Sequence, residues 1–157
     1  MIRPNRIASF VLAALLFASG GLLAADKDAD EKKAAQGIEG RVVKLKGNFM
    51  PGPGAGNRGG ARTPLAVPVH VFKGKVEPFE KPDPDHEQLV KIVRADKKGR
   101  FKIGLEPGTY TVVAEIDGKM YLNLMQFVDG KSVWGSVTVK KGQWTTMSIE
   151  DTSEAAF

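Results

Sequence analysis

Alternation of apolar and polar residues, broken at short intervals by glycine or proline, is the feature that most limits how this chain can fold. In residues 67–72 (VPVHVF) valine occupies every second position, and residues 100–105 (RFKIGL) alternate in the same way. A period of two is typical of a strand that buries one face. From Ile38 onward we find no stretch with the 3.6-residue period of a helix, so an all-β fold is predicted.

Turn residues divide this pattern into short strands. Residues 96–99 (DKKG), 106–108 (EPG) and 117–118 (DG) are typical turn sequences between strands. Short strands with turns every 8–12 residues or so favour an antiparallel sandwich, and we expect one of seven strands. The expected strands are residues 41–45, 67–72, 89–94, 100–105, 109–117, 133–139 and 145–150, with weaker candidates at 120–124 and 126–128.

The first 25 residues have the layout of a secretory signal peptide. Arg3 and Arg6 precede an apolar run over residues 7–17, and small residues lead to a cleavage position at Ala24 or Ala25. The apolar run is shorter than the roughly 20 residues that a membrane-spanning helix needs. We therefore expect an exported protein, periplasmic or secreted, with no membrane span after cleavage.

The remainder divides into a spacer and one domain. Residues 26–37 are highly charged and nearly devoid of large apolar side chains, which predicts a solvated, disordered spacer before a domain over residues 38–157. Without the signal peptide, 21 Lys and Arg face 18 Asp and Glu, and this small, scattered excess gives no reason to expect nucleic acid as a partner. The chain has no cysteine, which excludes a disulfide scaffold and thiolate metal sites.

Two motifs could indicate cofactor or metal binding, but the residues around each motif do not provide the structure that such binding needs. Residues 54–59 (GAGNRG) match the dinucleotide pattern G-x-G-x-x-G, but the following GARTP cannot open the helix that binds the pyrophosphate. Residues 82–87 (PDPDHE) are rich in oxygen ligands but lack the glycine and spacing of a Ca²⁺ loop. We expect no catalytic residue, cofactor or metal. A small hydrolase or metal-dependent enzyme on a transthyretin-like fold is the alternative.

Two long inserts and one tryptophan provide the candidate binding surface. Residues 46–66 and 73–88 exceed the usual loop length, and such loops are usually functional or disordered. His70 and Trp134 each alternate with apolar neighbours, so both are expected to face outward, although Trp134 could instead close the end of the sandwich. Arginine side chains form charge-assisted hydrogen bonds with anions, and tryptophan rings stack on sugars or anchor protein interfaces. The candidate contact residues are Arg58, Arg62, Tyr121 and Trp134.

One motif resembles a known family. The pattern D-x-x-G-x-F…L-x-P-G-x-Y-x-V over residues 96–112 is similar to carboxypeptidase regulatory-like domains, and the resemblance extends over residues 38–150. These domains are prealbumin-like, or transthyretin-type, seven-stranded β-sandwiches. The resemblance implies a non-enzymatic binding or structural module of the cell envelope, with a protein or a polysaccharide as its partner. The residues that match are Asp96, Gly99, Phe101, Leu105, Pro107, Gly108, Tyr110 and Val112.

Overall fold

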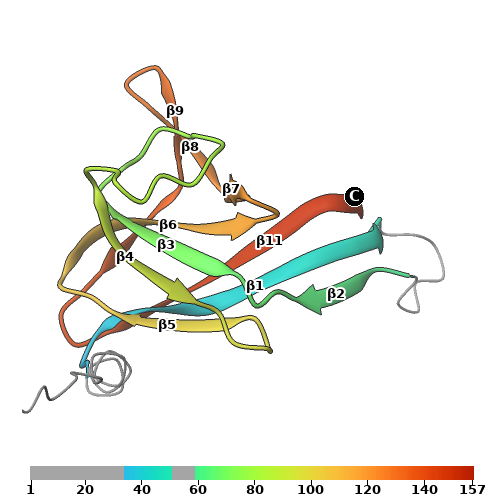
Figure 1. Ribbon diagram of the computed structural model, residues 1–157, viewed down its shortest axis with the longest axis horizontal. Coiled ribbons are helices and arrows are strands. Elements are labelled where there is room, and N and C mark those ends of the chain that lie inside the picture. Colours follow the sequence, from blue (N-terminus) through green and yellow to red (C-terminus); the bar gives the residue numbers. More distant parts are fainter. Residues whose placement is uncertain (1–33, 51–58) are drawn as a thin grey trace, which may run out of the picture.

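Two facing β-sheets and a small separate hairpin make up the described part of the protein, which confirms the predicted all-β sandwich (Figure 1). The computed structural model describes residues 34–50 and 59–157, and no helix occurs among them. The strands are β1 (Gly37–Asn48), β2 (Ala61–Pro64), β3 (Pro68–Lys73), β4 (Leu89–Arg94), β5 (Arg100–Gly104), β6 (Gly108–Ile116), β7 (Lys119–Tyr121), β8 (Met125–Val128), β9 (Lys131–Trp134), β10 (Ser136–Val139) and β11 (Trp144–Ala156).

The strands form two layers and a separate hairpin. In the first layer, here sheet A, the order is β11-β1-β2, and β5 also pairs with β1. In the second layer, sheet B, the order is β10-β6-β3-β4, and β7 extends the end of β6. Strands β8 and β9 pair with each other and project from the sandwich (Figure 1). Six of the seven expected strands are β1, β3, β4, β5, β6 and β11, and the seventh, residues 133–139, covers the end of β9 and all of β10. The weaker candidates at residues 120–124 and 126–128 overlap β7 and β8, and β2 was not predicted.

The first and last strands depart from the antiparallel expectation. Strands β1 and β11 run parallel, from Gly37 opposite Trp144 to Asn48 opposite Ala156. A parallel pair needs a long crossover connection, and here the rest of the domain provides it. Each strand gives the other a long series of backbone partners, so both extend beyond the predicted limits. Gly37, assigned to the spacer from the sequence, already belongs to β1.

The main core lies between the sheets and follows the predicted alternation. Burying these side chains contributes about 25 cal/mol per Å² of apolar surface. Tyr110 is also buried, and its hydroxyl donates to the Glu106 carbonyl at 3.0 Å, so the predicted turn at residues 106–108 holds this ring in the core. Side chains fully removed from water here include Ile38, Val42, Val69, Val71, Ile103, Val112, Ala114 and Ile149.

A second apolar cluster, which we call the outer core, covers the other face of sheet B. Phe72 packs edge-on against Phe79 and His86, with ring centroids 5.7 and 5.1 Å away. Trp134 packs against Phe79 at 5.0 Å. Phe79 and His86 both come from residues 74–88, which we call the covering loop. The outer core consists of Phe72, Val76, Phe79, His86 and Trp134.

Backbone hydrogen bonds attach the covering loop to the strands beside it. The N–H of Met120 donates to the Glu80 carbonyl at 2.8 Å, and the N–H of Trp134 donates to the Val76 carbonyl at 2.9 Å. At the base of the loop the Gln88 side chain donates to the carbonyls of Lys73 and Lys75. The long insert predicted at residues 73–88 therefore has a structural role over sheet B.

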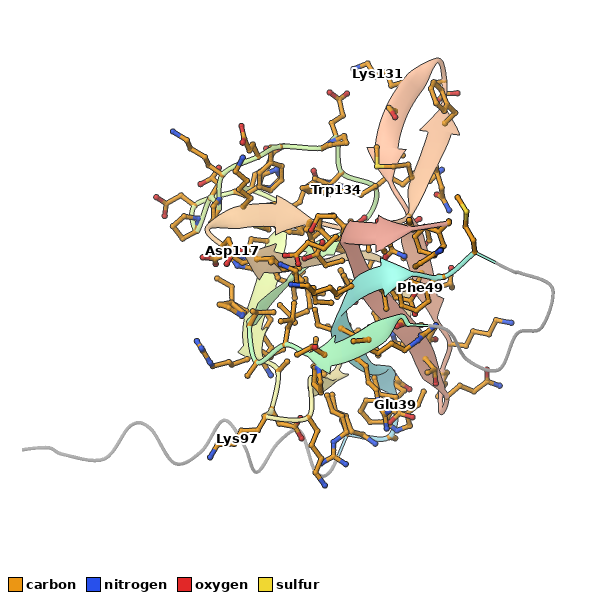
Figure 2. The ribbon with its side chains drawn as sticks, turned by 90° about the vertical axis from the view of Figure 1, so that its right-hand side faces the viewer. Glu39, Phe49, Lys97, Asp117, Lys131 and Trp134 are labelled. Atoms are coloured by element: carbon orange, nitrogen blue, oxygen red, sulfur yellow. The ribbon has the colours of Figure 1, made fainter. Side chains whose placement is uncertain are left out.

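The outer core overturns two predictions of solvent exposure. Trp134 is only 4% exposed, because residues 133–139 are two strands separated at Gly135, and alternation does not carry across that break. Figure 2 shows Trp134 beneath the hairpin that carries Lys131 at its tip. His70 is 3% exposed, stacks on Phe72 and places Nε2 3.1 Å from Glu115 Oε2. His70 does point away from Val69 and Val71, as expected, but the expectation that it meets solvent is wrong. For Trp134 the outward position is wrong, and the alternative of a buried position is the one that fits.

The first long insert is shorter than predicted. Its ends are strands, since Lys46 still belongs to β1 and pairs with Ala61 of β2. Arg58, most of the GAGNRG motif and the predicted signal peptide lie outside the described residues. Among the residues that are described, none forms a helix long and apolar enough to cross a membrane.

Candidate ligand groove

An open groove of about 780 Å³ crosses the outer face of sheet A. Strands β5, β1 and β11 form it, together with Asp96 from the turn before β5. In Figure 2 the groove residue Glu39 and the hairpin residue Lys131 lie at opposite ends of the molecule. The groove is lined by Glu39, Gly40, Arg41, Asp96, Arg100, Phe101, Lys102, Thr146, Met147 and Ser148.

Strand register brings distant parts of the sequence together in this groove. Ile38 and Val42 of β1 point into the core, so the residues between them at odd positions point outward. The same alternation on β5 and β11 turns charged and hydroxyl side chains to the same side. Two rows of outward side chains cross the sheet: Lys102, Glu39 and Thr146 in one, and Arg100, Arg41 and Ser148 in the other.

In the first row, Lys102 is held by two contacts. Its ammonium lies 3.1 Å from the Glu39 carboxylate and 4.0 Å from the centre of the Trp144 ring. A cation over an indole face is attracted by the ring's negative charge density, which adds to the ion pair. Lys102 is thus fixed between the groove and the half-buried Trp144.

In the second row, the turn before β5 fixes Arg100. Asp96 Oδ1 accepts hydrogen bonds from the backbone N–H groups of Lys98 (2.8 Å) and Arg100 (2.9 Å), and Oδ2 lies 2.9 Å from the Arg100 guanidinium. The backbone hydrogen bond from Arg100 is the main reason that the pKa of Asp96 is lowered from its ordinary 3.8. Gly99 completes the turn with φ of 71°, and a Cβ there would meet the Val42 carbonyl oxygen.

Arg41, in the middle of the second row, has a different environment. Its side chain is exposed, and within the described residues no carboxylate lies within 4.0 Å of its guanidinium. It stands directly opposite Arg100 on β5 and Ser148 on β11. Like charges opposite each other on neighbouring strands are unfavourable. The groove therefore has an uncompensated cation at its centre.

Two of the residues predicted from sequence meet elsewhere on sheet A. Arg62 Nη1 lies 3.2 Å from Glu150 Oε1, and the Tyr121 hydroxyl donates to the Glu150 carbonyl at 3.2 Å. Glu150 follows Ser148 by two positions on β11, so Arg62 continues the outer face beyond the groove. Trp134, by contrast, lies in the outer core, away from both.

The acidic segment predicted as a weak Ca²⁺ candidate does not gather its ligands. Asp83 Oδ1 accepts the N–H of Asp85, and His86 Nδ1 accepts the N–H of Gln88. The His86 ring stacks on Phe79 with centroids 5.2 Å apart. In the part of the chain that the structure describes, no group of three or more His, Asp or Glu residues could hold a metal ion.

Sequence reasoning did not find the groove. Its polar residues occupy outward positions of predicted strands, which is where solvated side chains also occur. One signal is present in the sequence: β1 and β5 each carry two charged residues that are two positions apart. Only the register between the strands shows that these charged residues lie opposite each other. The residues missed were Glu39, Arg41, Asp96, Arg100, Lys102, Thr146 and Ser148.

Comparison with known proteins gives only distant likenesses. No protein-family model and no curated protein matches the chain. Among solved structures, a proposed carbohydrate-binding protein from Pseudomonas aeruginosa is 18% identical, with 82% of this chain and 97% of that chain covered and a TM-score of 0.38. A minor pilin from Streptococcus agalactiae is 20% identical, with 75% and 44% covered and a TM-score of 0.36. Such scores carry no argument about function.

Proposed function

We propose that this protein is an exported, non-enzymatic binding module of the cell envelope and that it binds a polysaccharide in the groove of sheet A. The groove itself is the observation that carries the proposal. Its floor is formed by the backbone of Gly40, Phe101 and Met147, whose side-chain positions face the core, while charged groups and hydroxyls surround it. Sugars present many hydroxyl groups, which can exchange hydrogen bonds with these charged and hydroxyl side chains.

The composition of the groove favours a glycan over a protein partner. Protein interfaces depend on a few large apolar or aromatic anchors that enter pockets on the partner. Among the described residues, the large apolar side chains that are exposed all lie outside the groove. These are Met50, Val90, Ile92, Leu124, Met125, Phe127 and Phe157.

Fixed side chains support a binding role. Lys102 and Arg100 are each held by a carboxylate, Glu39 or Asp96, so ligand binding would order few further groups. Preorganised contacts lower the entropic cost of binding. We propose that Arg62 extends this surface, with Tyr121 supporting it through Glu150. Arg58 lies outside the described residues, and its contact with ligand stays a prediction from the sequence. Trp134 is withdrawn from the proposed surface because it is buried.

The family assignment is part of the same proposal. Residues of the motif that resembles carboxypeptidase regulatory-like domains occupy the structural positions that the motif implies. Asp96 and Gly99 form the turn, Phe101 is buried, and Tyr110 is anchored to Glu106. We propose membership of that family, and residues 1–25 support export by a signal peptide.

A blocking variant tests whether the groove binds glycan. The protein without residues 1–25 is titrated with a panel of soluble envelope polysaccharides, and affinity is measured by calorimetry. Ser148→Tyr places a ring in the groove at an exposed position, and Ser132→Tyr places the same ring on the exposed hairpin strand β9 as the matched control. We expect Ser148→Tyr to lower affinity about tenfold or more and Ser132→Tyr to leave it unchanged.

Two results would overturn the proposal. One is the absence of binding to every polysaccharide in a broad panel by a folded protein. The other is equal affinity of the Ser148→Tyr variant and the unmodified protein. Loss of polysaccharide binding in a Phe127→Asp variant, whose parent side chain is 81% exposed on the hairpin, would likewise contradict the proposal, because it would place the glycan site on the hairpin.

A further inference from the structure

We propose that the polysaccharide carries an anionic group, a carboxylate or a phosphate, and that Arg41 is the residue that binds it. This inference rests on the proposed function and specifies the ligand of the same groove. The charges that line the groove lead to it. Two of the groove's three cations are paired with carboxylates, and the third, Arg41, has no carboxylate partner among the described residues.

The two carboxylates of the groove are both engaged. Glu39 Oε2 lies 3.1 Å from Lys102 Nζ, and Asp96 accepts both the backbone and the side chain of Arg100. Neither carboxylate is free to turn toward Arg41 without giving up these contacts. A ligand is therefore the natural source of a counter-charge for Arg41.

The position of Arg41 makes a counter-charge favourable. It is on the central strand β1, directly opposite Arg100, so two arginines project from neighbouring positions of the outer face. An anion beside Arg41 would relieve the repulsion between them and form charge-assisted hydrogen bonds with the planar guanidinium. Asp96 already compensates the charge of Arg100, so a neutral sugar would leave only Arg41 without a counter-charge from the described residues.

Hydroxyl groups complete the proposed subsite. Ser148 stands opposite Arg41 on β11, and Thr146 is two positions earlier on the same exposed face. A serine hydroxyl can donate to an anionic oxygen or accept from a sugar hydroxyl. Guanidinium and hydroxyl together suit a sugar that bears a carboxylate or phosphate among its hydroxyls.

The experiment compares three probes of similar chain length: a polyuronate, a phosphate-bearing glycan and a neutral glucan. Each is titrated by calorimetry into the protein without residues 1–25 and into its Arg41→Gln, Arg41→Lys and Arg94→Gln variants. Arg94 is the matched control, because it is an exposed arginine on strand β4 of the other sheet. Thermal unfolding of each variant shows whether the fold is retained.

We expect an anionic probe to bind at least about tenfold more tightly than the neutral glucan. Arg41→Gln should abolish that difference, Arg41→Lys should restore part of it, and Arg94→Gln should leave it unchanged. The affinity for the anionic probe should also fall as salt concentration rises. Preference for the polyuronate assigns a carboxylate, and preference for the phosphate-bearing glycan assigns a phosphate.

The possible failures are distinguishable. If the neutral glucan binds as tightly as either anionic probe and Arg41→Gln changes nothing, the anionic ligand is disproved while the groove still binds glycan. If a folded protein binds none of the three probes or any other polysaccharide, the proposed function fails and the inference fails with it.

Discussion

The two outer faces of this sandwich differ in whether other parts of the chain cover them. The outer face of sheet B carries Phe72 and is largely covered by the covering loop, which adds Phe79 and His86 above it, whereas Ile92 on edge strand β4 stays 44% exposed. The outer face of sheet A carries charged and hydroxyl side chains and remains open as a groove. One face has become a second interior, and the other is accessible to a ligand.

This difference shows that a long loop on this sandwich need not be a binding loop. The covering loop is long enough to be a candidate binding loop, yet its aromatic side chains point inward and its backbone bonds to strands β7 and β9. Function on this sandwich is better sought where nothing covers the sheet. Four predictions test this division, beginning with the largest effect.

Truncating the outer core should have the largest effect on stability. Replacing Trp134, which is 4% exposed, with alanine removes its contacts with Phe79, and we expect a loss of about 3–5 kcal/mol in the free energy of unfolding. Urea denaturation measures this loss. Phe127→Ala, at an 81% exposed position, is the control and should change stability by no more than about 0.5 kcal/mol. Equal effects of the two substitutions would contradict a second core.

The turn that positions the groove should tolerate little change. Gly99→Ala faces both a positive φ of 71° and the Val42 carbonyl, whereas Gly118→Ala has a similar φ of 73° with nothing within 4 Å. Backbone strain costs about 1–2 kcal/mol in both. Crowding should cost Gly99→Ala about 1–3 kcal/mol more, as measured by urea unfolding. Similar losses for both variants would mean that the turn does not pack closely on β1.

Removing the Tyr121 hydroxyl should have a smaller effect. This hydroxyl donates to the Glu150 carbonyl and accepts the N–H of Thr152, so it joins β7 of sheet B to β11 of sheet A. We expect Tyr121→Phe to destabilise the protein by about 0.5–1.5 kcal/mol in thermal or urea unfolding. Unchanged stability would show that this link between the layers does not contribute.

The smallest expected effect depends on pH. Because hydrogen bonds from Arg100 lower the pKa of Asp96 in the folded state, the carboxylate stabilises the fold at pH values above its ordinary 3.8 and loses this contribution as pH falls below it. Asp96→Asn should therefore be less stable than the unmodified protein at pH 7, and the difference should shrink in acid. Unfolding curves measured from pH 7 to pH 3 test this. A difference that grows in acid would contradict the assigned cause.

The strands could be predicted from the sequence, and their pairing could not. Alternation located β3 and β5, and the Asp96–Gly99 and Asp117–Gly118 turns fell where expected, with φ of 71° at Gly99 and 51° at Asp117. Strand β2 (ARTP) was missed because all four of its residues are exposed, and a strand without a buried face has no alternation to detect.

The errors in the candidate site have the same origin. Alternation assigns a side chain to one face of a sheet, but it does not say whether that face is covered. For this reason His70 was predicted to meet solvent, although it lies on the covered side. Trp134 was misplaced because the alternation was carried across the break at Gly135. Arg41, Arg100 and Ser148 are far apart in the sequence and meet only through the pairing of β1 with β5 and β11.

The central claim is that ligand binds the open face of sheet A and not the covered face of sheet B. Amide chemical shifts recorded by NMR during titration with the tightest-binding polysaccharide test it most directly. The account predicts that shifts concentrate at residues 39–41, 100–102 and 146–148, with little change at residues 74–88. Shifts concentrated in the covering loop or in the β8–β9 hairpin would contradict it.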